Sequence, residues 1–228
     1  MLLTIPNVLS AEQLSLVRDK LNAAGDAWVD GRATAGHQGA QVKRNLQIDE
    51  HAPVAIALGD LILAELERHP LFISATLPHH VYPPMFNLYQ GGMEFGSHVD
   101  GAVRLVPGSR AKIRTDISVT LFLSEPDSYD GGELLVEDTY GVHTVKLPAG
   151  HMIVYPASSL HQVKPVTRGT RLASFFWVQS MIRDDAQRTL LFDVDSAIQR
   201  LNQSGGDAHA LVQLTGSYHN LLRMWTDI

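Results

Sequence analysis

Two histidines and one aspartate form the most chemically informative pattern in the chain. His98 and Asp100 are separated by one residue, and His161 lies in a second strand-like stretch. Side chains alternate between the faces of a strand, so a strand over His98–Ala102 would turn His98 and Asp100 toward one ion. Two histidines and a carboxylate on one side of an octahedral ion leave positions open for a cosubstrate and oxygen. We therefore predict that His98, Asp100 and His161 form a catalytic Fe(II) site.

Arg171 is the second residue whose position could serve chemistry. It follows His161 by ten residues and begins the apolar and aromatic run Arg171–Val178, which we interpret as a buried strand. An unpaired guanidinium is costly to bury, whereas its planar fork matches a carboxylate in two hydrogen bonds. An anionic ligand in the metal cavity would satisfy this guanidinium. An internal salt bridge or an arginine that extends to the surface is the alternative.

Five motifs link these residues to a known family. They are Asn87–Gln90, His98–Ala102, Arg114–Leu123, Tyr129–Leu134 and Ser159–Arg171. Together they resemble the PKHD-type hydroxylases, a bacterial branch of the Fe(II)/2-oxoglutarate dioxygenases that is related to prolyl 4-hydroxylases. The likeness runs from near Met1 to Ile228. One departure is His151, where we would expect an acidic residue, and it leaves the three metal ligands untouched.

The resemblance implies a role for each candidate residue. His98, Asp100 and His161 would hold iron, and Arg171, helped by Tyr89, would bind the distal carboxylate of 2-oxoglutarate. With O2, such an enzyme hydroxylates a small-molecule or peptide substrate and releases succinate and CO2. Ascorbate would restore iron that became oxidised. Members of this branch are associated with bacterial iron uptake, so the resemblance makes a siderophore or its breakdown product a candidate substrate.

The spacing of apolar residues predicts a mainly β fold with flanking helices. Ser10 begins a capping box, and a first helix should run to about Gly25. A second helix is expected over Pro53–Arg68, after a glycine-rich loop and a short polar strand that begin at Asp30. These helices should support a jelly-roll, cupin-like core, a double-stranded β-helix of about eight antiparallel strands. We place its strands at Met85–Gln90, His98–Ala102, Thr115–Leu123, Glu133–Glu137, Val142–Leu147, Met152–Tyr155, Gln162–Val166 and Leu172–Gln179.

The chain is expected to contain one catalytic domain and a helical extension. Residues 1–180 would form the dioxygenase domain, with the jelly-roll core at about 80–180. Residues 181–228 would form two helices that break at Ser204–Gly206. This hairpin could cap the core or bury its apolar stripe in a homo-oligomer.

Composition excludes several classes of function. The chain has 228 residues, of which 45% are hydrophobic and 18% charged, the balance of a globular protein. A formal charge of −6 gives no footprint for nucleic acid, and the absence of cysteine excludes disulfides and thiolate chemistry. No apolar run is long enough for a membrane span and no leader is visible, so we expect a cytoplasmic protein.

Basic residues near the metal motif indicate where a substrate could bind. Arg104, Arg110, Lys112 and Arg114 follow His98 and Asp100 directly and could attract an anionic or metal-chelating substrate. His37, Lys43 and Arg44 in the earlier loop are weaker candidates, because a solvated loop also explains them.

Two other functions fit part of the pattern. A cupin-type metalloenzyme that does not use 2-oxoglutarate could have the same three ligands, but it would not require Arg171. A non-catalytic jelly-roll sensor for a metal or another ligand would need no open iron position. Binding of 2-oxoglutarate to the Fe(II) protein separates these alternatives.

Overall fold

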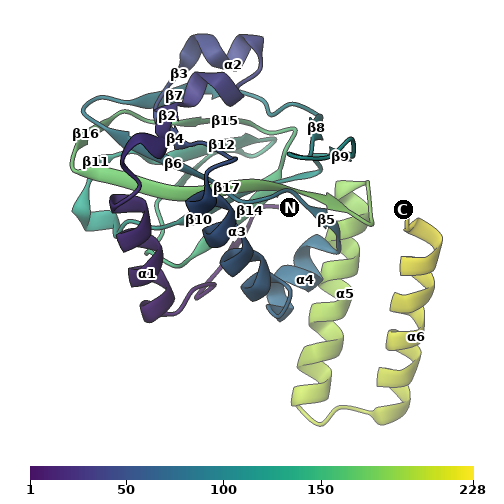
Figure 1. The fold of residues 1–228 in the computed structure, drawn as a ribbon. Helices are drawn as coiled ribbons and strands as arrows, with labels where there is room; N and C mark the ends of the chain where they lie inside the picture. The colour runs from purple at the N-terminus through teal and green to yellow at the C-terminus, as the bar shows by residue number, and fades with distance from the viewer.

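Two antiparallel sheets that face each other form the core of the protein, which confirms the predicted jelly-roll architecture (Figure 1). The computed structural model describes all residues, 1–228. The larger sheet has the strand order β1 (Leu3–Ile5), β14 (Met152–Pro156), β10 (Ile117–Phe122), β17 (Thr170–Ser180), β6 (Met85–Gln90), β4 (Leu46–Ile48) and β2 (Trp28–Asp30), and β5 (Pro78–Val81) also pairs with β17. The smaller sheet has the order β13 (Gly141–Val145), β12 (Leu134–Asp138), β15 (Leu160–Val163), β7 (Glu94–His98) and β3 (Lys43–Arg44).

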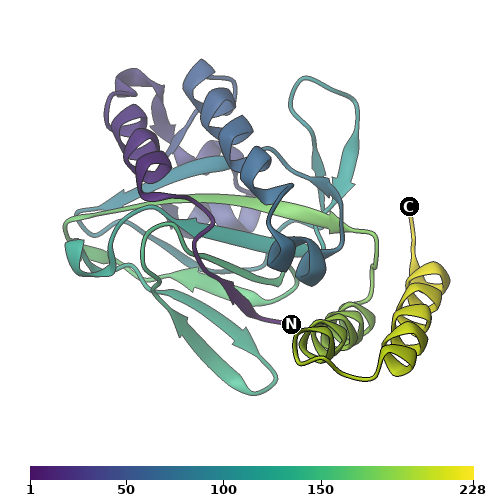
Figure 2. The same cartoon turned by 90° about the horizontal axis from the view of Figure 1, so that it is seen from below.

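Two short strand pairs complete the β structure. Strands β8 (Val103–Leu105) and β9 (Lys112–Arg114) form a hairpin, and β11 (Asp130–Gly131) pairs with β16 (Val166–Arg168). Figure 2 shows one hairpin, in the colour of residues near 100–115, as an arm that projects beyond the sheets. The segment after the metal motif, predicted to be a basic loop, is therefore a β-hairpin at the edge of the core.

Helices cover the outer face of the larger sheet. Helices α1 (Ala11–Asn22), α3 (Pro53–Leu66) and α4 (Pro70–Thr76) contribute to one apolar cluster with strands of that sheet (Figure 1). Ser10 caps α1 through the predicted capping box, and its buried residues recur at helical spacing. The predicted buttressing role of the two N-terminal helices is confirmed.

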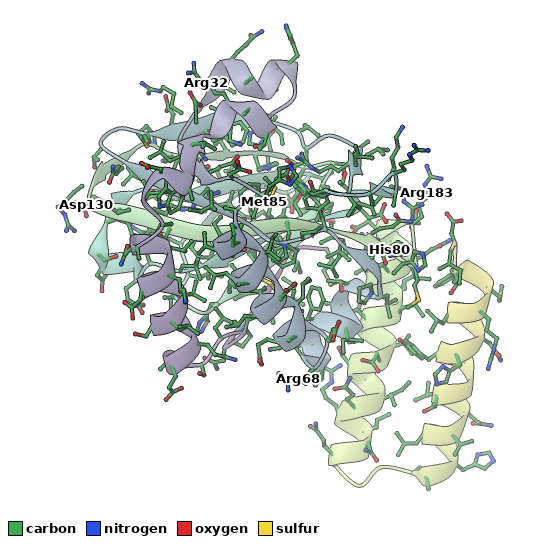
Figure 3. The ribbon with its side chains drawn as sticks, in the orientation of Figure 1. Arg32, Arg68, His80, Met85, Asp130 and Arg183 are labelled. Atoms are coloured by element: carbon green, nitrogen blue, oxygen red, sulfur yellow. The ribbon has the colours of Figure 1, made fainter.

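The larger sheet is buried on both faces, which explains its unbroken apolar runs. In β10, Val119 and Leu121 pack against the helices, whereas Phe122 belongs to the cluster between the sheets. Strand β14 alternates in the same way, with Val154 toward the helices and Tyr155 toward the interior. In Figure 3, Met85 lies inside the core, while the labelled charged residues are at its margins. Polar residues that face inward are therefore unusual and mark the site.

Three other predicted local structures are wrong. The strand predicted over His98–Ala102 ends at His98, because residues 99–102 form no ladder hydrogen bonds. The loop predicted from Asp30 contains a 3-10 turn over Gly31–Thr34 and helix α2 (His37–Val42). The strand predicted over Gln162–Val166 is divided between β15 and β16, because Pro165 has no amide hydrogen to donate to a ladder.

The C-terminal residues form the predicted helical hairpin of α5 (Asp185–Gln203) and α6 (Ala208–Trp225), which projects from the core (Figure 1). A cluster around Leu77, Ile182 and Leu191 joins it to the core, and residues of α6 pack against that cluster. An isolated β-bridge between Ile182 and Thr226 adds a backbone connection. None of the helices combines the length and apolar character that a membrane crossing requires.

Candidate metal and cosubstrate site

The two histidines of the predicted triad come together through strand pairing. His98 ends β7, and His161 is its direct partner on the neighbouring strand β15. The two imidazole centroids are 4.2 Å apart. Because directly paired residues of antiparallel strands point to the same face, this register brings together two ligands that are 63 positions apart in sequence.

Asp100 reaches the same point from a loop, so the alternation of a strand is not what places it. Its Oδ1 lies 4.0 Å from His98 Nε2, and its Oδ2 lies 3.7 Å from His161 Nε2. Ser118 Oγ on β10 and Trp177 Nε1 on β17 donate hydrogen bonds to Asp100 Oδ2, the second over 2.9 Å. Two donors from the larger sheet therefore hold a carboxylate that lies in the loop after β7 of the smaller sheet.

Backbone carbonyls fix the orientation of both imidazole rings. His98 Nδ1 donates to Gly96 O over 2.8 Å, and His161 Nδ1 donates to Ser159 O over 3.0 Å. A carbonyl can only accept, so Nδ1 carries the proton and Nε2 presents its lone pair to the cavity. Burial, and next the neighbouring His161, hold the pKa of His98 well below its ordinary value. A neutral imidazole is the form that binds a metal.

The three residues meet the requirements of a metal site. One ligand atom from each lies within 4.8 Å of the other two. Both histidines are 6% exposed, so a cation between them would be shielded from bulk water. Neutral imidazoles with one carboxylate, and no thiolate anywhere in the chain, match the donor set that Fe(II) takes in oxygenases.

Arg171 is buried in the same cavity without a partner for two of its donors. The residue is 1% exposed, and neither Nε nor Nη1 has a hydrogen-bond acceptor. Its guanidinium carbon lies 5.3 Å from the ring centroids of both Tyr89 and Phe122. An unpaired buried guanidinium is costly, so this arrangement fits a bound carboxylate. The alternative of an internal salt bridge does not apply.

Tyr89 lies beside Arg171 because the two residues are direct partners on β6 and β17. Burial raises the pKa of Tyr89 to about 12, so its phenol keeps its proton at neutral pH. A protonated phenol can donate to the same carboxylate as the arginine. The strand register thus groups the two residues that were predicted to bind 2-oxoglutarate.

Gly132 leaves the space that Arg171 occupies. A Cβ atom at Gly132 would lie 3.0 Å from Arg171 Cδ and 2.9 Å from a ring carbon of Tyr129. The backbone there has a φ of +67°, which favours glycine. The Asp130–Glu133 turn therefore allows the arginine to enter the core.

One cavity of about 440 Å³ connects the three candidate metal ligands with Arg171 and Tyr89. Its volume suits a small ligand beside a metal. Tyr129, which contacts the Arg171 end, has a buried hydroxyl without a partner. No sequence pattern indicates Trp177 or Tyr129 as part of the site. Ser118 is a polar residue within an apolar strand, which is a signal that could have indicated it.

The basic residues predicted near the substrate separate into two groups. Arg104 lines the cavity, and its guanidinium carbon lies 4.2 Å from the Trp177 ring centroid. Arg110 and Lys112 are exposed and do not line the cavity. Arg114 is bound to Asp116 and lies near Asp227, so it does not belong to a substrate-binding group.

The basic residues of the segment that begins at Asp30 also fall into two groups. His37 and Lys43 line the cavity, whereas Arg44 is exposed and forms a salt bridge with Glu94. His151 is not among the residues that line the cavity.

Comparisons with known proteins agree with this geometry. The family model of the 2OG-Fe(II) oxygenase superfamily matches residues 84–179, and that of the PKHD-type hydroxylase C-terminal domain matches residues 185–227. PKHD-type hydroxylases of Burkholderia ambifaria and Paraburkholderia phytofirmans are 71% and 70% identical over 227 residues, with complete coverage of both chains. A prolyl-4-hydroxylase structure from Pseudomonas putida has a TM-score of 0.52 at 21% identity, covering 78% of this chain and 92% of its own. This structural likeness concerns the fold.

Proposed function

This chain belongs to the PKHD-type hydroxylase family of 2OG-Fe(II) oxygenases, and from that premise we propose that it hydroxylates an anionic substrate at the site built by His98, Asp100, His161 and Arg171. The observation that carries the proposal is the buried Arg171, whose unpaired donors face the cavity of the three metal ligands. A metal site that used no carboxylate cosubstrate would give this arginine no partner.

Each residue has a distinct task in this proposal. His98, Asp100 and His161 hold Fe(II), and Arg171 with Tyr89 binds the distal carboxylate of 2-oxoglutarate. When bound, iron, 2-oxoglutarate and O2 supply the hydroxylation of a C–H bond, with release of succinate and CO2. The protein holds the substrate in a fixed position and keeps bulk water away. The fully buried Tyr89 and Tyr129 keep water away from the part of the cavity that binds 2-oxoglutarate.

The substrate class rests on charge at the cavity. Arg104 brings a cation to the metal side of the cavity although the chain as a whole carries −6. We infer a small or extended anionic or metal-chelating substrate, for which a siderophore or its breakdown product is a candidate by family association. A proline-containing peptide is the rival, because structurally similar proteins include prolyl hydroxylases.

The test is formation of succinate coupled to a hydroxylated product. Fe(II)-loaded protein is incubated with 2-oxoglutarate, O2 and either catecholate or hydroxamate siderophores or peptides that contain proline or lysine. Arg104→Ala is compared with Arg110→Ala, because Arg110 is an exposed arginine outside the cavity. We expect coupled turnover with an anionic compound that Arg104→Ala weakens and Arg110→Ala preserves. Coupled hydroxylation of a neutral peptide, equal in both variants, would refute the substrate class.

Three further properties belong to the proposal. Ascorbate would restore iron oxidised in turnover without substrate, and added ascorbate should prolong activity.

The exposed apolar residues Val212 and Met224 of α6 are consistent with a homo-oligomer through the C-terminal helices, which light scattering would detect. We also infer that the enzyme works in the cytoplasm, where 2-oxoglutarate is supplied by central metabolism.

A further inference from the structure

Lys43 is a buried cation that the proposed reaction does not yet use. It is 4% exposed and lines the cavity, and its single hydrogen-bond acceptor is Thr34 Oγ1 at 3.3 Å. An ammonium group has three donors and is costly to bury without a counter-charge. This is the same signature that Arg171 has at the 2-oxoglutarate end.

Arg104 lines the cavity as well, and neither cation has an anionic partner. No salt bridge of the protein involves Lys43 or Arg104. Burial, and next the charge of Arg104, lower the pKa of Lys43 to about 8, although Asp100 and Asp30 act in the opposite direction. Lys43 Nζ lies 5.8 Å from the ring centroid of Phe175, and the guanidinium carbon of Arg104 lies 4.2 Å from that of Trp177. The two cations therefore border neighbouring parts of one cavity wall, and an anion bound there would offset both charges.

Each cation lies one aromatic ring away from a metal ligand. Lys43 Nζ is 5.0 Å from the ring centroid of Phe95, which stacks on His98 at 3.5 Å. On the other side, the Arg104 guanidinium lies over Trp177, whose Nε1 donates to Asp100. A group held by both cations would thus lie beside the metal.

The cavity wall between the cations suits a ligand with apolar and polar parts. Phe175 and Trp177 face the cavity from β17 and meet edge to face, with ring centroids 5.7 Å apart. Gln47 Nε2 and Asn87 Oδ1 line the same cavity and have no partners. A planar or aliphatic anion could cover the rings while its polar atoms meet these amides.

We propose that Lys43 and Arg104 form the anion-binding site for the substrate, taking a carboxylate that lies close to the C–H bond to be hydroxylated. This inference rests on the proposed function and deepens it, because it specifies where the anionic group binds. It also predicts regiochemistry, since the position of the cations beside His98 and Asp100 places the reacting carbon near the carboxylate. Neither residue binds 2-oxoglutarate, whose own cation is Arg171.

Benzoate is a suitable probe, with the uncharged benzamide as its isosteric control. Each compound is titrated anaerobically into protein saturated with Fe(II) and 2-oxoglutarate, and the metal-to-ligand charge-transfer band is followed. The ε-carbons of lysine are followed in parallel by carbon-13 NMR, because the chain has only five lysines and the Lys43 signal is assigned from Lys43→Met. The variants are Lys43→Met and Arg104→Met, with Arg44→Met as the exposed control beside Lys43.

We expect benzoate to bind more tightly than benzamide and to shift the Lys43 signal. Each cavity variant should weaken benzoate binding by roughly ten-fold, as expected for loss of one charge-assisted contact. The benzoate affinity of Arg44→Met, and the 2-oxoglutarate affinity of all three variants, should stay unchanged. Equal binding of benzoate and benzamide, or unchanged benzoate affinity in Lys43→Met, would overturn the anion site. Absence of the band in the unmodified protein would instead overturn the proposed function, so the two failures are distinguishable.

Discussion

The chemistry at the residue scale depends on buried cations that have no carboxylate partner in the protein. Arg171 and Lys43 are cations of this kind at two places along one cavity, and the metal ligands lie in the same cavity. The core would be more stable if apolar side chains replaced these buried cations. We interpret them as positions at which stability is given up for ligand binding.

Arg171→Lys tests the binding of 2-oxoglutarate. Lysine keeps the charge but cannot form two parallel hydrogen bonds to a carboxylate. We expect the apparent Michaelis constant for 2-oxoglutarate to rise roughly ten- to hundred-fold, corresponding to about 1.5–3 kcal/mol. Arg168→Lys is the control, because Arg168 is exposed and bound to Asp130. Equal constants in the two variants would be incompatible with the role of Arg171.

Ser118→Ala tests how Asp100 is held. Loss of the hydroxyl that donates to Asp100 should weaken Fe(II) binding by roughly ten-fold, because such hydrogen bonds orient metal ligands. Ser174→Ala is a matched control, since Ser174 is buried on the neighbouring strand and its hydroxyl has no partner. Calorimetric titration with Fe(II) under anaerobic conditions measures both. Iron affinity that is the same in both variants would show that Ser118 does not position Asp100.

Lys43→Met should stabilise the fold near neutral pH. The pKa of Lys43 is about 8 in the folded protein and 10.5 ordinarily, so its burial penalty is fully present below pH 8 and disappears above pH 10.5. Between these values the unfolded chain binds more protons, and the free energy of unfolding rises with pH. We expect Lys43→Met to gain up to about 3 kcal/mol at pH 7 and little at pH 10.5.

Urea unfolding at several pH values measures this gain. Lys20→Met is the control, because Lys20 is exposed on α1 and should show no such pH-dependent difference. If Lys43→Met were less stable than the unmodified protein at pH 7, the buried ammonium would already be satisfied within the fold.

At the scale of elements, strong periodicity made most of the fold predictable. Strand β6 has the predicted bounds, and α1 and α3 begin where the capping box and Pro53 indicate. Helix α4 was missed because Pro70 ends one helix pattern and also occupies the first turn of the next, where its missing amide hydrogen has no effect. Helix α2 was missed because it has only six residues, glycine among them, and packs against β7.

Strand pairing explains why some parts of the site could not be predicted from the sequence. The ligand types and the ten-residue step to Arg171 were visible in sequence. The pairing of His98 with His161, and of Tyr89 with Arg171, depends on register between distant strands. Lys43 looked like part of a solvated loop, because only its position on β3 beside β7 buries it. Sequence composition carries no information on such pairings.

Leu191→Ala tests the junction between the C-terminal hairpin and the core. Leu191 is fully buried in the cluster that joins α5 to Leu77 and Ile182, so its truncation should cost about 2–5 kcal/mol of stability. Leu190→Ala is the matched control, because the neighbouring leucine is 54% exposed. Thermal unfolding followed by circular dichroism compares the two. Similar melting temperatures would mean that the hairpin is not anchored through this cluster.

On the scale of the whole molecule, the two sheets divide the work of the site. The smaller sheet and the loop after β7 supply the three proposed metal ligands, and the larger sheet supplies Arg171, Tyr89 and the donors that hold Asp100. Opposite walls of one cavity therefore have to keep their relative position for the site to exist. The division into a catalytic domain up to residue 180 and a helical extension stays a prediction, which limited proteolysis near that position would examine.

We propose above all that one cavity holds Fe(II) through His98, Asp100 and His161 and holds 2-oxoglutarate through Arg171. The most direct test of this claim is anaerobic titration of the Fe(II)-loaded protein with 2-oxoglutarate, followed by visible absorption. We expect a weak metal-to-ligand charge-transfer band that saturates with one 2-oxoglutarate per chain, and that is lost in His161→Ala. No band in the unmodified protein, or a full band in His161→Ala, would contradict the claim.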